Sequence, residues 1–457
     1  MNDRKGFGSN FGFLMAAVGS AVGLGNIWGF PNKMGANGGF PFLILYLALA
    51  LCCGVIIMLG ELALGRKTGH GAVGAYQSIS KRFKWLGWLG IAAAALIFSF
   101  YSALGGYCLR YVVVNFGNLI GAEFGTNGVG GADVFQGLLS QPDVSIAFAL
   151  AFMLITMLVV MSGVGGGIER VCSVGMPALF FILIICIIRS CTLPGAADGL
   201  KYMFVPGWAV ANGIIDEAPG FWRVLTAAGG QMFFSLSLGA GVMITYGSYL
   251  DKKQDLGKSA MIIVGMDTVV ALMAGLCVIP GRFALDPSGD LGGPELLFIT
   301  MQNVFDKMGP AGPVFGILFY LLVFFAAISS SISMLEVIVA HFCDKAREKG
   351  KGDRRKLYSA IAVVICAALC ALVCADGMGS NHISPAELLG LAGAKLPGWS
   401  TSWLGLFDSV AEGLLMPLGA LLMCLMISWE LKPDALRQEI LLNGENRPWV
   451  YDFFRLC

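Results

Sequence analysis

Residues 19–31 read GSAVGLGNIWGFP, a run rich in glycine that ends in a proline within an otherwise apolar segment. Each glycine inside a helix costs about 1 kcal/mol relative to alanine, so this stretch predicts an interrupted helix. The surrounding apolar segment, residues 11–33, is long enough to cross a membrane. Close packing of two helices through small residues is the alternative reading, and this stretch alone does not decide between them.

A second interrupted segment lies in the corresponding place of the other half of the chain, where residues 233–246 read FFSLSLGAGVMITY. Paired discontinuous helices in two halves of five spans indicate a binding site at the membrane midplane. There, helix N-termini face an anion and freed carbonyl groups face a cation. The pair therefore favours a transporter over simple helix packing.

The composition supports a membrane protein. Of 457 residues, 57% are hydrophobic and 13% are charged, whereas soluble domains average about 45–50% and about 25%. Strict alternation over segments of about ten residues, which a barrel needs, is absent, so we expect an all-α polytopic protein. The apolar segments predict spans at residues 11–33, 40–64, 88–116, 146–162, 170–190, 222–249, 259–283, 312–342, 357–374 and 406–429.

We expect one transporter domain over residues 1–457, made of two inverted five-helix repeats at 11–190 and 222–429. Residues 430–457 are predicted to be a cytoplasmic segment in which an eleventh span begins. Residues 289–309 are broken by glycine and proline, so an outer hairpin, with a lid as one role, suits them better than a span.

The basic residues predict the orientation. Of 30 Lys and Arg residues, 22 lie at the termini and in alternate loops, so both termini are expected in the cytoplasm. The formal net charge of +1 gives no basic face for nucleic acid. Lipid is the expected surrounding, and a homodimer stays open.

Polar residues inside the spans are candidate ligands. Ser329 and Ser330 lie in the eighth span, and serines there commonly bond back to the helix, but hydroxyls next to free carbonyls also suit a sodium ion. Asp267 in the seventh span needs a cation or a partner, because a carboxylate at that depth costs roughly 2.5 to 3.5 kcal/mol. Glu61 is interpreted as an interfacial residue or as a cap on freed amides.

Several of these motifs together resemble the bacterial branch of the neurotransmitter:sodium symporter family, from about residue 5 to residue 430. The resemblance implies a leucine-transporter-like fold with broken first and sixth helices, placed in the inner membrane of a bacterial cell. The motifs are Ala21–Trp28 with Phe30-Pro31, 37–39 (NGG), 60–66 (GELALGR), 99–101 (SFY), 231–237 (QMFFSLS) and 245–249 (TYGSY).

The resemblance implies two sodium sites. The first is expected to use Ala21, Asn26, Ser235 and Asp267, and the second Gly19, Val22, Ala326, Ser329 and Ser330. Animal members bind chloride one helical turn beyond Asp267, where this chain has Ala271, so no chloride is expected.

The resemblance also implies a site for an amino acid. Its carboxylate is expected near Gly23, Gly25 and the Tyr101 hydroxyl, and its side chain against a mostly apolar wall. The full set is Ser20, Ala21, Gly23, Gly25, Ile97, Tyr101, Phe234, Ser235, Ser237, Ala240, Ser331 and Met334. Because Ala240 falls where some relatives carry a large aromatic residue, we expect bulky apolar or aromatic amino acids.

The gates are the last implication. The cytoplasmic gate is expected to use Arg4, Phe7, Ser248, Tyr249 and Asp344. The usual outer ion pair is missing, since Gly29 and Ala411 stand at its positions. Its substitute is either Lys33 with Asp408 or Glu412, or a steric seal by Phe234 and Tyr101.

The predicted function is sodium-coupled, chloride-independent symport of an amino acid by alternating access. A receptor or vestigial transporter of the same fold, which binds the amino acid without moving it, is the alternative. An enzyme is not expected, because His70, His341 and His382 lie in loops or at span ends and no nucleophile with a nearby base is evident.

Overall fold

The computed structural model describes residues 6–126, 128–285, 293–388, 390, 400–432, 434–441 and 448–456. All regular secondary structure in these residues is helical. Eight unbroken helices and one bent pair of helices in this part of the chain are long and apolar enough to cross a membrane. The prediction of an all-α polytopic protein is confirmed.

The first five spans follow the predicted order, with ends that extend beyond the expected ranges. They are formed by α1 (Asn10–Ala21), η1 (Gly25–Gly29) and α2 (Phe30–Ala36); α3 (Phe40–Leu49), η2 (Ala50–Gly54) and α4 (Val55–Thr68); α6 (Lys84–Ile120); α8 (Pro142–Met161); and η4 (Val164–Ile168) with α9 (Glu169–Cys191). Short helices link them, namely α5 (Ala72–Ile79), η3 (Lys81–Phe83) and α7 (Gly131–Leu139).

The predicted sixth to tenth spans follow. They are formed by α12 (Phe221–Ser235) with α13 (Val242–Gly247), α14 (Leu256–Leu285), α17 (Gly312–Glu348), α18 (Arg355–Asp376), and the series α20 (Trp403–Val410), η9 (Ala411–Leu415), α21 (Met416–Met426) and η10 (Ile427–Leu431). The broken pair α12 and α13 among them does not belong to the eight helices and one bent pair counted above in the described residues. The connecting helices are α10 (Ala196–Phe204), α11 (Trp208–Ala211), α15 (Gly293–Glu295), η5 (Leu296–Thr300), α16 (Met301–Asp306), η6 (Gly309–Ala311), η7 (Gly377–Gly379) and α19 (Pro385–Leu388).

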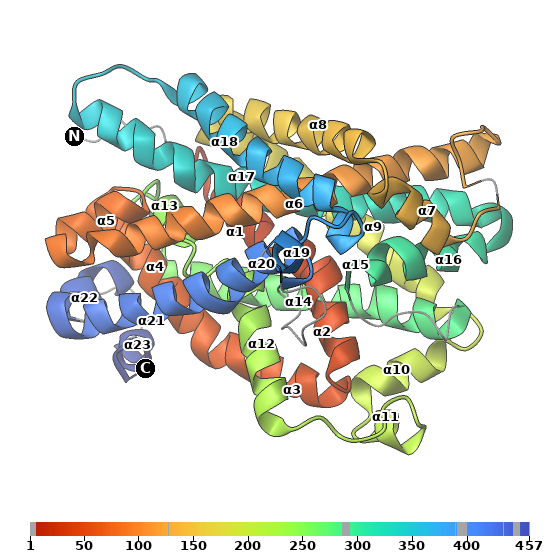
Figure 1. Cartoon of the computed structure of the whole chain (residues 1–457). Coiled ribbons are helices and arrows are strands. Elements are labelled where there is room, and N and C mark those ends of the chain that lie inside the picture. Colours follow the sequence, from red (N-terminus) through yellow and green to blue (C-terminus); the bar gives the residue numbers. More distant parts are fainter. Residues whose placement is uncertain are drawn as a thin grey trace.

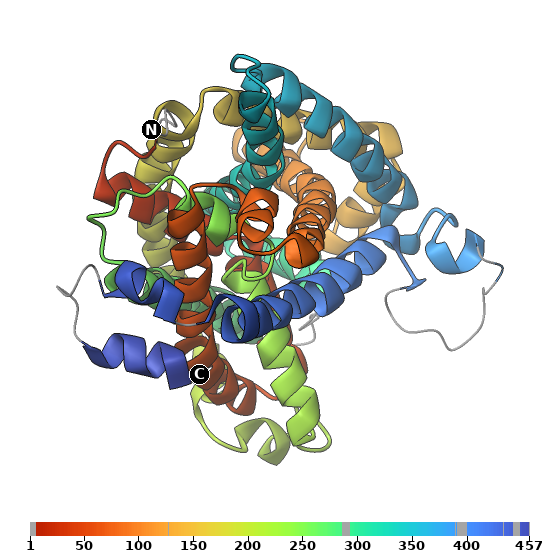
Figure 2. The same ribbon diagram turned by 90° about the vertical axis from the view of Figure 1, so that its left-hand side faces the viewer.

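The spans run side by side along the long axis of the molecule (Figure 1), and Figure 2 looks along that axis. The two longest helices, α6 and α17, have 37 residues each and make the most extensive contact in the protein. The helices of the broken spans, α1 and α13, pack against α17 of this pair. α15 and α16 lie at the end opposite α5, where an outer hairpin was predicted; its residues 289–292 are outside the described part.

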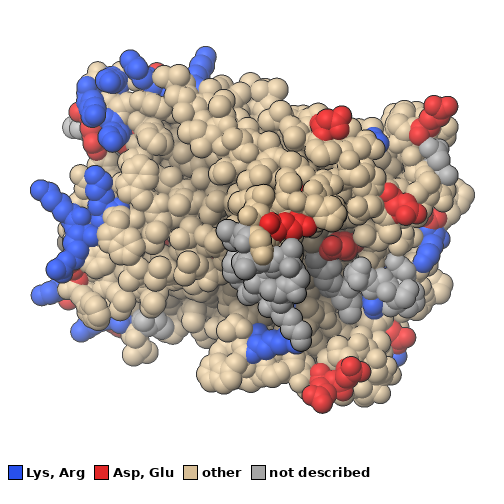
Figure 3. Space-filling model, in the orientation of Figure 1, with Lys and Arg blue, Asp and Glu red and all other residues tan. Residues whose placement is uncertain are grey.

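Lysine and arginine side chains gather over the end of the molecule that carries the N-terminus, α5 and α22, whereas several acidic side chains lie toward the other end (Figure 3). This separation agrees with the predicted orientation, in which the basic end is cytoplasmic. The residues after η10 form α22 (Asp434–Ile440) and α23 (Pro448–Leu456) at the basic end.

Hydrogen bonds join α22 to the second span and α23 to α22. Arg66 in α4 bonds to the Glu439 carboxylate at 2.7 Å and to the carbonyl oxygen of that residue. The Tyr451 hydroxyl donates to Asp434 at 2.6 Å. α23 has nine residues, fewer than the about 20 of a spanning helix.

Candidate functional site

The break in the first span leaves backbone groups free near the middle of the bundle. α1 ends at Ala21, Val22 has an extended backbone, and the chain bends by 45° before it continues as η1 and α2. The Val18 carbonyl still accepts the Val22 N–H, but the carbonyl groups of Gly19 and Ser20 instead face serine hydroxyls from other spans. Gly23 is required here, because a Cβ atom would overlap Oγ of Ser330 and lie 3.1 Å from the Tyr101 hydroxyl.

The break in the sixth span covers residues 236–241 between α12 and α13. Ser237, Gly239 and Gly241 all have positive φ angles, of 53°, 82° and 75°. A Cβ atom at Gly239 would overlap the carbonyl oxygen of Met416, so the chain approaches the tenth span as closely as glycine allows. The Ser237 hydroxyl donates to the Ser20 carbonyl at 3.1 Å, which ties the two breaks together.

Three of the four residues predicted for the first sodium site meet at Asp267. The Asn26 amide donates to Oδ1 of Asp267 at 2.7 Å, and the Ser235 hydroxyl donates to Oδ2 at 2.9 Å. The fourth residue, Ala21, is the last residue of α1. The side-chain oxygen of Asn26 accepts the Gly23 backbone N–H at 3.0 Å. A fully buried carboxylate thus lies at the break among neutral amide and hydroxyl groups.

All five residues predicted for the second site also come together. The Ser329 hydroxyl lies 3.4 Å from the Val22 carbonyl and 3.0 Å from the Ala326 carbonyl. The Ser330 hydroxyl lies 3.4 Å from the Gly19 carbonyl. Ser329 also bonds back to Phe325, so the helix-bonding alternative holds for part of its geometry.

The cluster of Gly19, Val22, Ala326, Ser329 and Ser330 contains only neutral oxygen donors. Within the described residues no group of three His, Cys, Asp or Glu side chains could hold a metal ion. Neutral hydroxyl and carbonyl oxygens suit hard cations, whereas softer transition metals prefer nitrogen and sulfur. The donor set therefore fits an alkali cation.

The predicted substrate residues enclose the space between the breaks. The Gly25 N–H donates to the Tyr101 hydroxyl at 3.3 Å, and the Tyr101 ring lies edge to face with Phe234 at 5.9 Å. The remaining residues of the set are also buried: Ser20, Ile97, Ala240, Ser331 and Met334. The hydroxyls of Ser20 and Ser331 are buried without a hydrogen-bond partner among the described residues.

Residues of both mechanisms predicted for the outer gate make contacts in the structure. Lys33 in α2 pairs with Glu412 in η9, not with Asp408. The Lys33 ammonium also lies 5.8 Å from the centre of the Phe234 ring, so the ion pair covers the aromatic seal. It joins the first span to the tenth directly above the predicted substrate site.

The inner side is closed by aromatic and charged residues. Phe7 packs edge to face with Tyr246 at 5.6 Å and with Tyr249 at 6.2 Å. Oδ2 of Asp344 accepts the Gly71 N–H at 3.1 Å, and the Ser248 hydroxyl donates to the Thr245 carbonyl. Arg4, also predicted for this gate, lies outside the described residues.

A second group at the inner side was missed by the sequence reasoning. The Tyr249 hydroxyl donates to Glu336 at 2.6 Å, and Arg355 donates to the same carboxylate at 2.6 and 3.0 Å. Glu336 is fully buried in the eighth span. A carboxylate inside an apolar span is a functional signal, and it would have identified Glu336 in the sequence.

Other contacts to the breaks were also missed. The Gln231 amide donates to the Gly25 carbonyl at 2.6 Å, and the Tyr46 hydroxyl donates to Asp267 at 3.2 Å. Oε1 of Glu61 accepts the Gly239 N–H at 2.6 Å, which shows the capping role that was one of its two interpretations. No short motif marks Tyr46, because its partner is distant in the sequence.

Comparisons with known proteins agree with this geometry. The sodium:neurotransmitter symporter family matches residues 4–127 and 132–457. The chain belongs to this family. Members are sodium-coupled transporters, so the chain is a multi-pass membrane transporter and not an enzyme.

Individual members of the sodium:neurotransmitter symporter family are similar to this chain over most of its length. An uncharacterized sodium-dependent transporter of Bacillus subtilis, YhdH, is 37% identical, over 98% of this chain and 93% of its own length. An uncharacterized sodium-dependent transporter of Methanocaldococcus jannaschii is 30% identical, over 96% of this chain and 84% of its own length.

Among solved structures, the crystal structure of MhsT in complex with L-phenylalanine superposes with a TM-score of 0.82. Its sequence is 34% identical, and the match covers 99% of this chain and 96% of that one. The predicted family and the leucine-transporter-like fold are therefore confirmed.

Proposed function

We propose that this member of the family is a symporter that couples two sodium ions to the uptake of a bulky apolar or aromatic amino acid. The observation that carries the proposal is the pair of oxygen clusters at the two breaks, one around Asp267 and one around Ser329 and Ser330. The second cluster joins the eighth span to the first through Ser330 and Gly19. A cation there ties together two spans that must separate during transport.

The predicted ligands also account for coupling. The amino acid carboxylate is placed beside Gly25 and Tyr101, next to the cluster around Asp267. A carboxylate that shares a sodium ion with Asn26 and Ser235 makes the affinity for each solute depend on the other, which is reciprocal linkage. Sodium and the amino acid together then order the broken helices better than either solute does alone.

Two features support the substrate class. The buried residue at position 240 of the predicted side-chain wall is a small alanine, and the structural relative MhsT has been crystallised with L-phenylalanine. Chloride independence is supported by Asp267, whose buried carboxylate supplies a negative charge beside the first cluster, and by Ala271, which offers no hydroxyl one turn further on.

The contacts between the spans suggest how alternating access proceeds. Spans 1, 2, 6 and 7 are proposed to rock against spans 3, 4, 8 and 9. Outer contacts between Lys33 and Glu412 and inner contacts between Tyr249 and Glu336 would break in turn. With both sets closed, the site is shielded from both sides.

A thermal-shift screen of the purified protein over the twenty amino acids tests this proposal. Aromatic and large aliphatic amino acids are expected to raise the melting temperature in sodium, with no effect when potassium replaces sodium. Replacement of chloride by gluconate should leave the shift unchanged. Equal stabilisation in potassium, or none by any amino acid in sodium, would refute the proposed coupling.

A further inference from the structure

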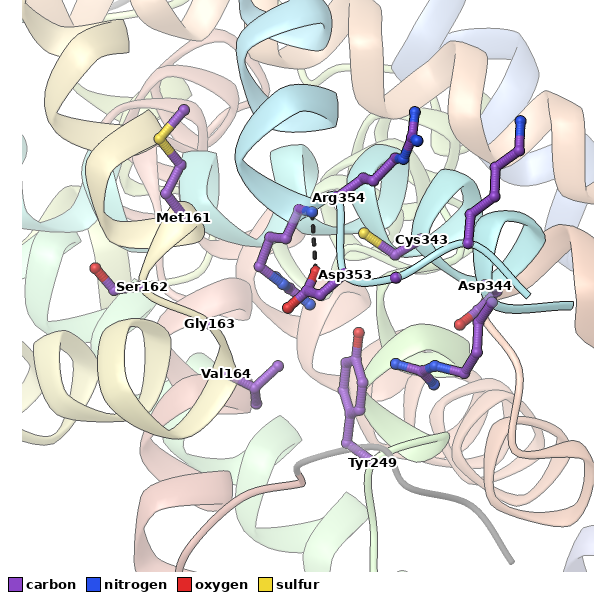
Figure 4. A pocket seen from close by; sticks show the side chains of 13 residues that line it. Met161, Ser162, Gly163, Val164, Tyr249, Cys343, Asp344, Asp353 and Arg354 are labelled. Carbon is purple, nitrogen blue, oxygen red and sulfur yellow. Dashed lines mark hydrogen bonds between the residues drawn. The ribbon is translucent and has the colours of Figure 1, made fainter. Parts of the chain in front are cut away.

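A charged cavity of about 570 Å³ opens at the basic end of the molecule, outside the two oxygen clusters (Figure 4). It lies between the end of α8, the first turns of η4, and the segment that joins α17 to α18. Its lining residues are Met161, Ser162, Gly163, Val164, Tyr249, Cys343, Asp344, Arg347, Lys351, Gly352, Asp353, Arg354 and Arg355.

The charge of this cavity is predominantly positive. The cavity has four basic lining residues. Of these, only Arg355 forms an ion pair within the described part of the chain, and its partner is Glu336. The other three, Arg347, Lys351 and Arg354, are exposed. Their side chains line the same cavity, and the Arg354 side chain extends away from Tyr249 and Val164 (Figure 4).

The two acidic residues in the cavity already accept backbone hydrogen bonds. Oδ1 of Asp353 accepts the Arg355 N–H at 2.9 Å, and Oδ2 of Asp344 accepts the Gly71 N–H at 3.1 Å. These bonds direct one oxygen of each carboxylate toward the backbone. The lining thus carries four basic side chains against two carboxylates, and the three basic side chains outside the Arg355 ion pair can bind an anion that enters the cavity.

Apolar surface continues directly from the cavity along the spans. Leu158 lies one turn before Met161 in α8 and is 55% exposed. Leu357 and Ile361 follow Arg355 in α18 and are 48% and 47% exposed. α8 and α18 pack against each other. A molecule with a charged head and apolar chains therefore meets matching surface in both parts, whereas a free anion uses only the first.

We propose that this cavity binds the phosphate-bearing headgroup of an anionic phospholipid, with its acyl chains along α8 and α18. Basic pockets between membrane helices at the cytoplasmic face bind such headgroups through the same chemistry. The site borders Tyr249 and Asp344, so a bound lipid contacts the segment that holds the inner side closed. The proposal therefore shares Tyr249 and Asp344 with the predicted cytoplasmic gate, but it does not rest on the proposed substrate or sodium coupling.

Native mass spectrometry of the detergent-solubilised protein with added phosphatidylglycerol tests the site. The variant Arg347→Gln/Lys351→Gln/Arg354→Gln removes the three free cations, and we expect its affinity for phosphatidylglycerol to fall about tenfold or more. A matched variant, Lys81→Gln/Arg82→Gln/Lys253→Gln, removes three exposed charges from the same end and is expected to bind as the wild type does. Sodium-dependent melting curves of both variants check that they are folded.

The competing sources of the anion are separated by two further probes. Phosphatidylcholine carries similar chains on a zwitterionic head and is expected to bind weakly to the wild type. Inorganic phosphate is not expected to displace phosphatidylglycerol at concentrations that leave the protein folded. Equal losses in both triple variants, or displacement by inorganic phosphate alone, would overturn the proposed lipid site.

Discussion

The amide nitrogen of Asn26 lies 2.7 Å from Oδ1 of Asp267, although 241 residues separate them in the sequence. This contact joins the break in the first span to the seventh span, and Ser235 brings the sixth span to the same carboxylate. Tyr46 of the second span also donates to this carboxylate, so four spans meet at one buried negative charge. A cation that replaces the amide nitrogen would hold them together.

Substitution of this carboxylate is the first test. Asp267→Ala is expected to abolish sodium-dependent binding of the amino acid. Asp267→Asn keeps a side chain of the same size but removes the charge, so we expect its sodium affinity to fall roughly tenfold or more. Isothermal titration with sodium measures both variants, and wild-type sodium affinity in Asp267→Ala would remove this residue from the site.

The serines of the eighth span test the second cluster. Ser329→Ala and Ser330→Ala each remove one neutral oxygen that faces the carbonyls of the first span, and each is expected to raise the sodium concentration needed for half-maximal binding. Ser102→Ala is the matched control, since that buried hydroxyl only bonds back to Phe98 in its own helix. Identical sodium titrations for all three variants would contradict the assignment.

The outer ion pair predicts a charge-dependent seal. Lys33→Gln and Glu412→Gln are each expected to speed the release of bound substrate to the outer side. The exchanged pair Lys33→Glu/Glu412→Lys should restore much of the retention. A double-mutant cycle on the release rate is expected to give about 1 kcal/mol of coupling for this partly buried pair. Additive effects of the two single changes would show that the pair does not act as a gate.

The inner pair predicts a stability effect. Arg355→Ala leaves the fully buried Glu336 carboxylate without its cation, which typically costs about 3–5 kcal/mol of folding free energy. Removing both charges in Arg355→Ala/Glu336→Leu should recover much of that loss. Melting temperatures measured beside Arg354→Ala, an exposed neighbour, check this account; a double variant no more stable than Arg355→Ala would speak against it.

Pocket volume is tested at the side-chain wall. Ala240→Phe fills the space that Ala240 leaves, so binding of aromatic amino acids is expected to weaken strongly while that of alanine or glycine persists. Competition with a radiolabelled aromatic amino acid measures the change. Unchanged affinity for phenylalanine and tryptophan would place the substrate side chain elsewhere.

Much of this architecture could be predicted because it rests on local signals. The clustered glycines between residues 19 and 29 and between 239 and 241 together lower helix propensity, and adjacent Ser329 and Ser330 project from one turn. The pairing of Lys33 with Glu412 over Asp408 could not be predicted. It depends on how α2 and η9 meet, and residues far apart in the sequence give no local pattern for such contacts.

The same limit explains why Glu336 and Arg355 were missed as a pair. Arg355 opens α18 after a basic loop, and in the sequence it is indistinguishable from Arg354. Only the packing of α18 turns one of these two side chains toward the buried carboxylate and leaves the other exposed. The fold therefore follows from pattern and family, while the gates follow from tertiary structure.

Uptake of a radiolabelled aromatic amino acid into proteoliposomes tests the central claim most directly. With sodium outside and potassium inside, we expect accumulation above the external concentration, in chloride-containing and chloride-free buffer alike. Collapse of the sodium gradient should release the accumulated amino acid. Equal uptake with potassium on both sides, or sodium-dependent binding without any accumulation, would contradict sodium-coupled transport by this protein.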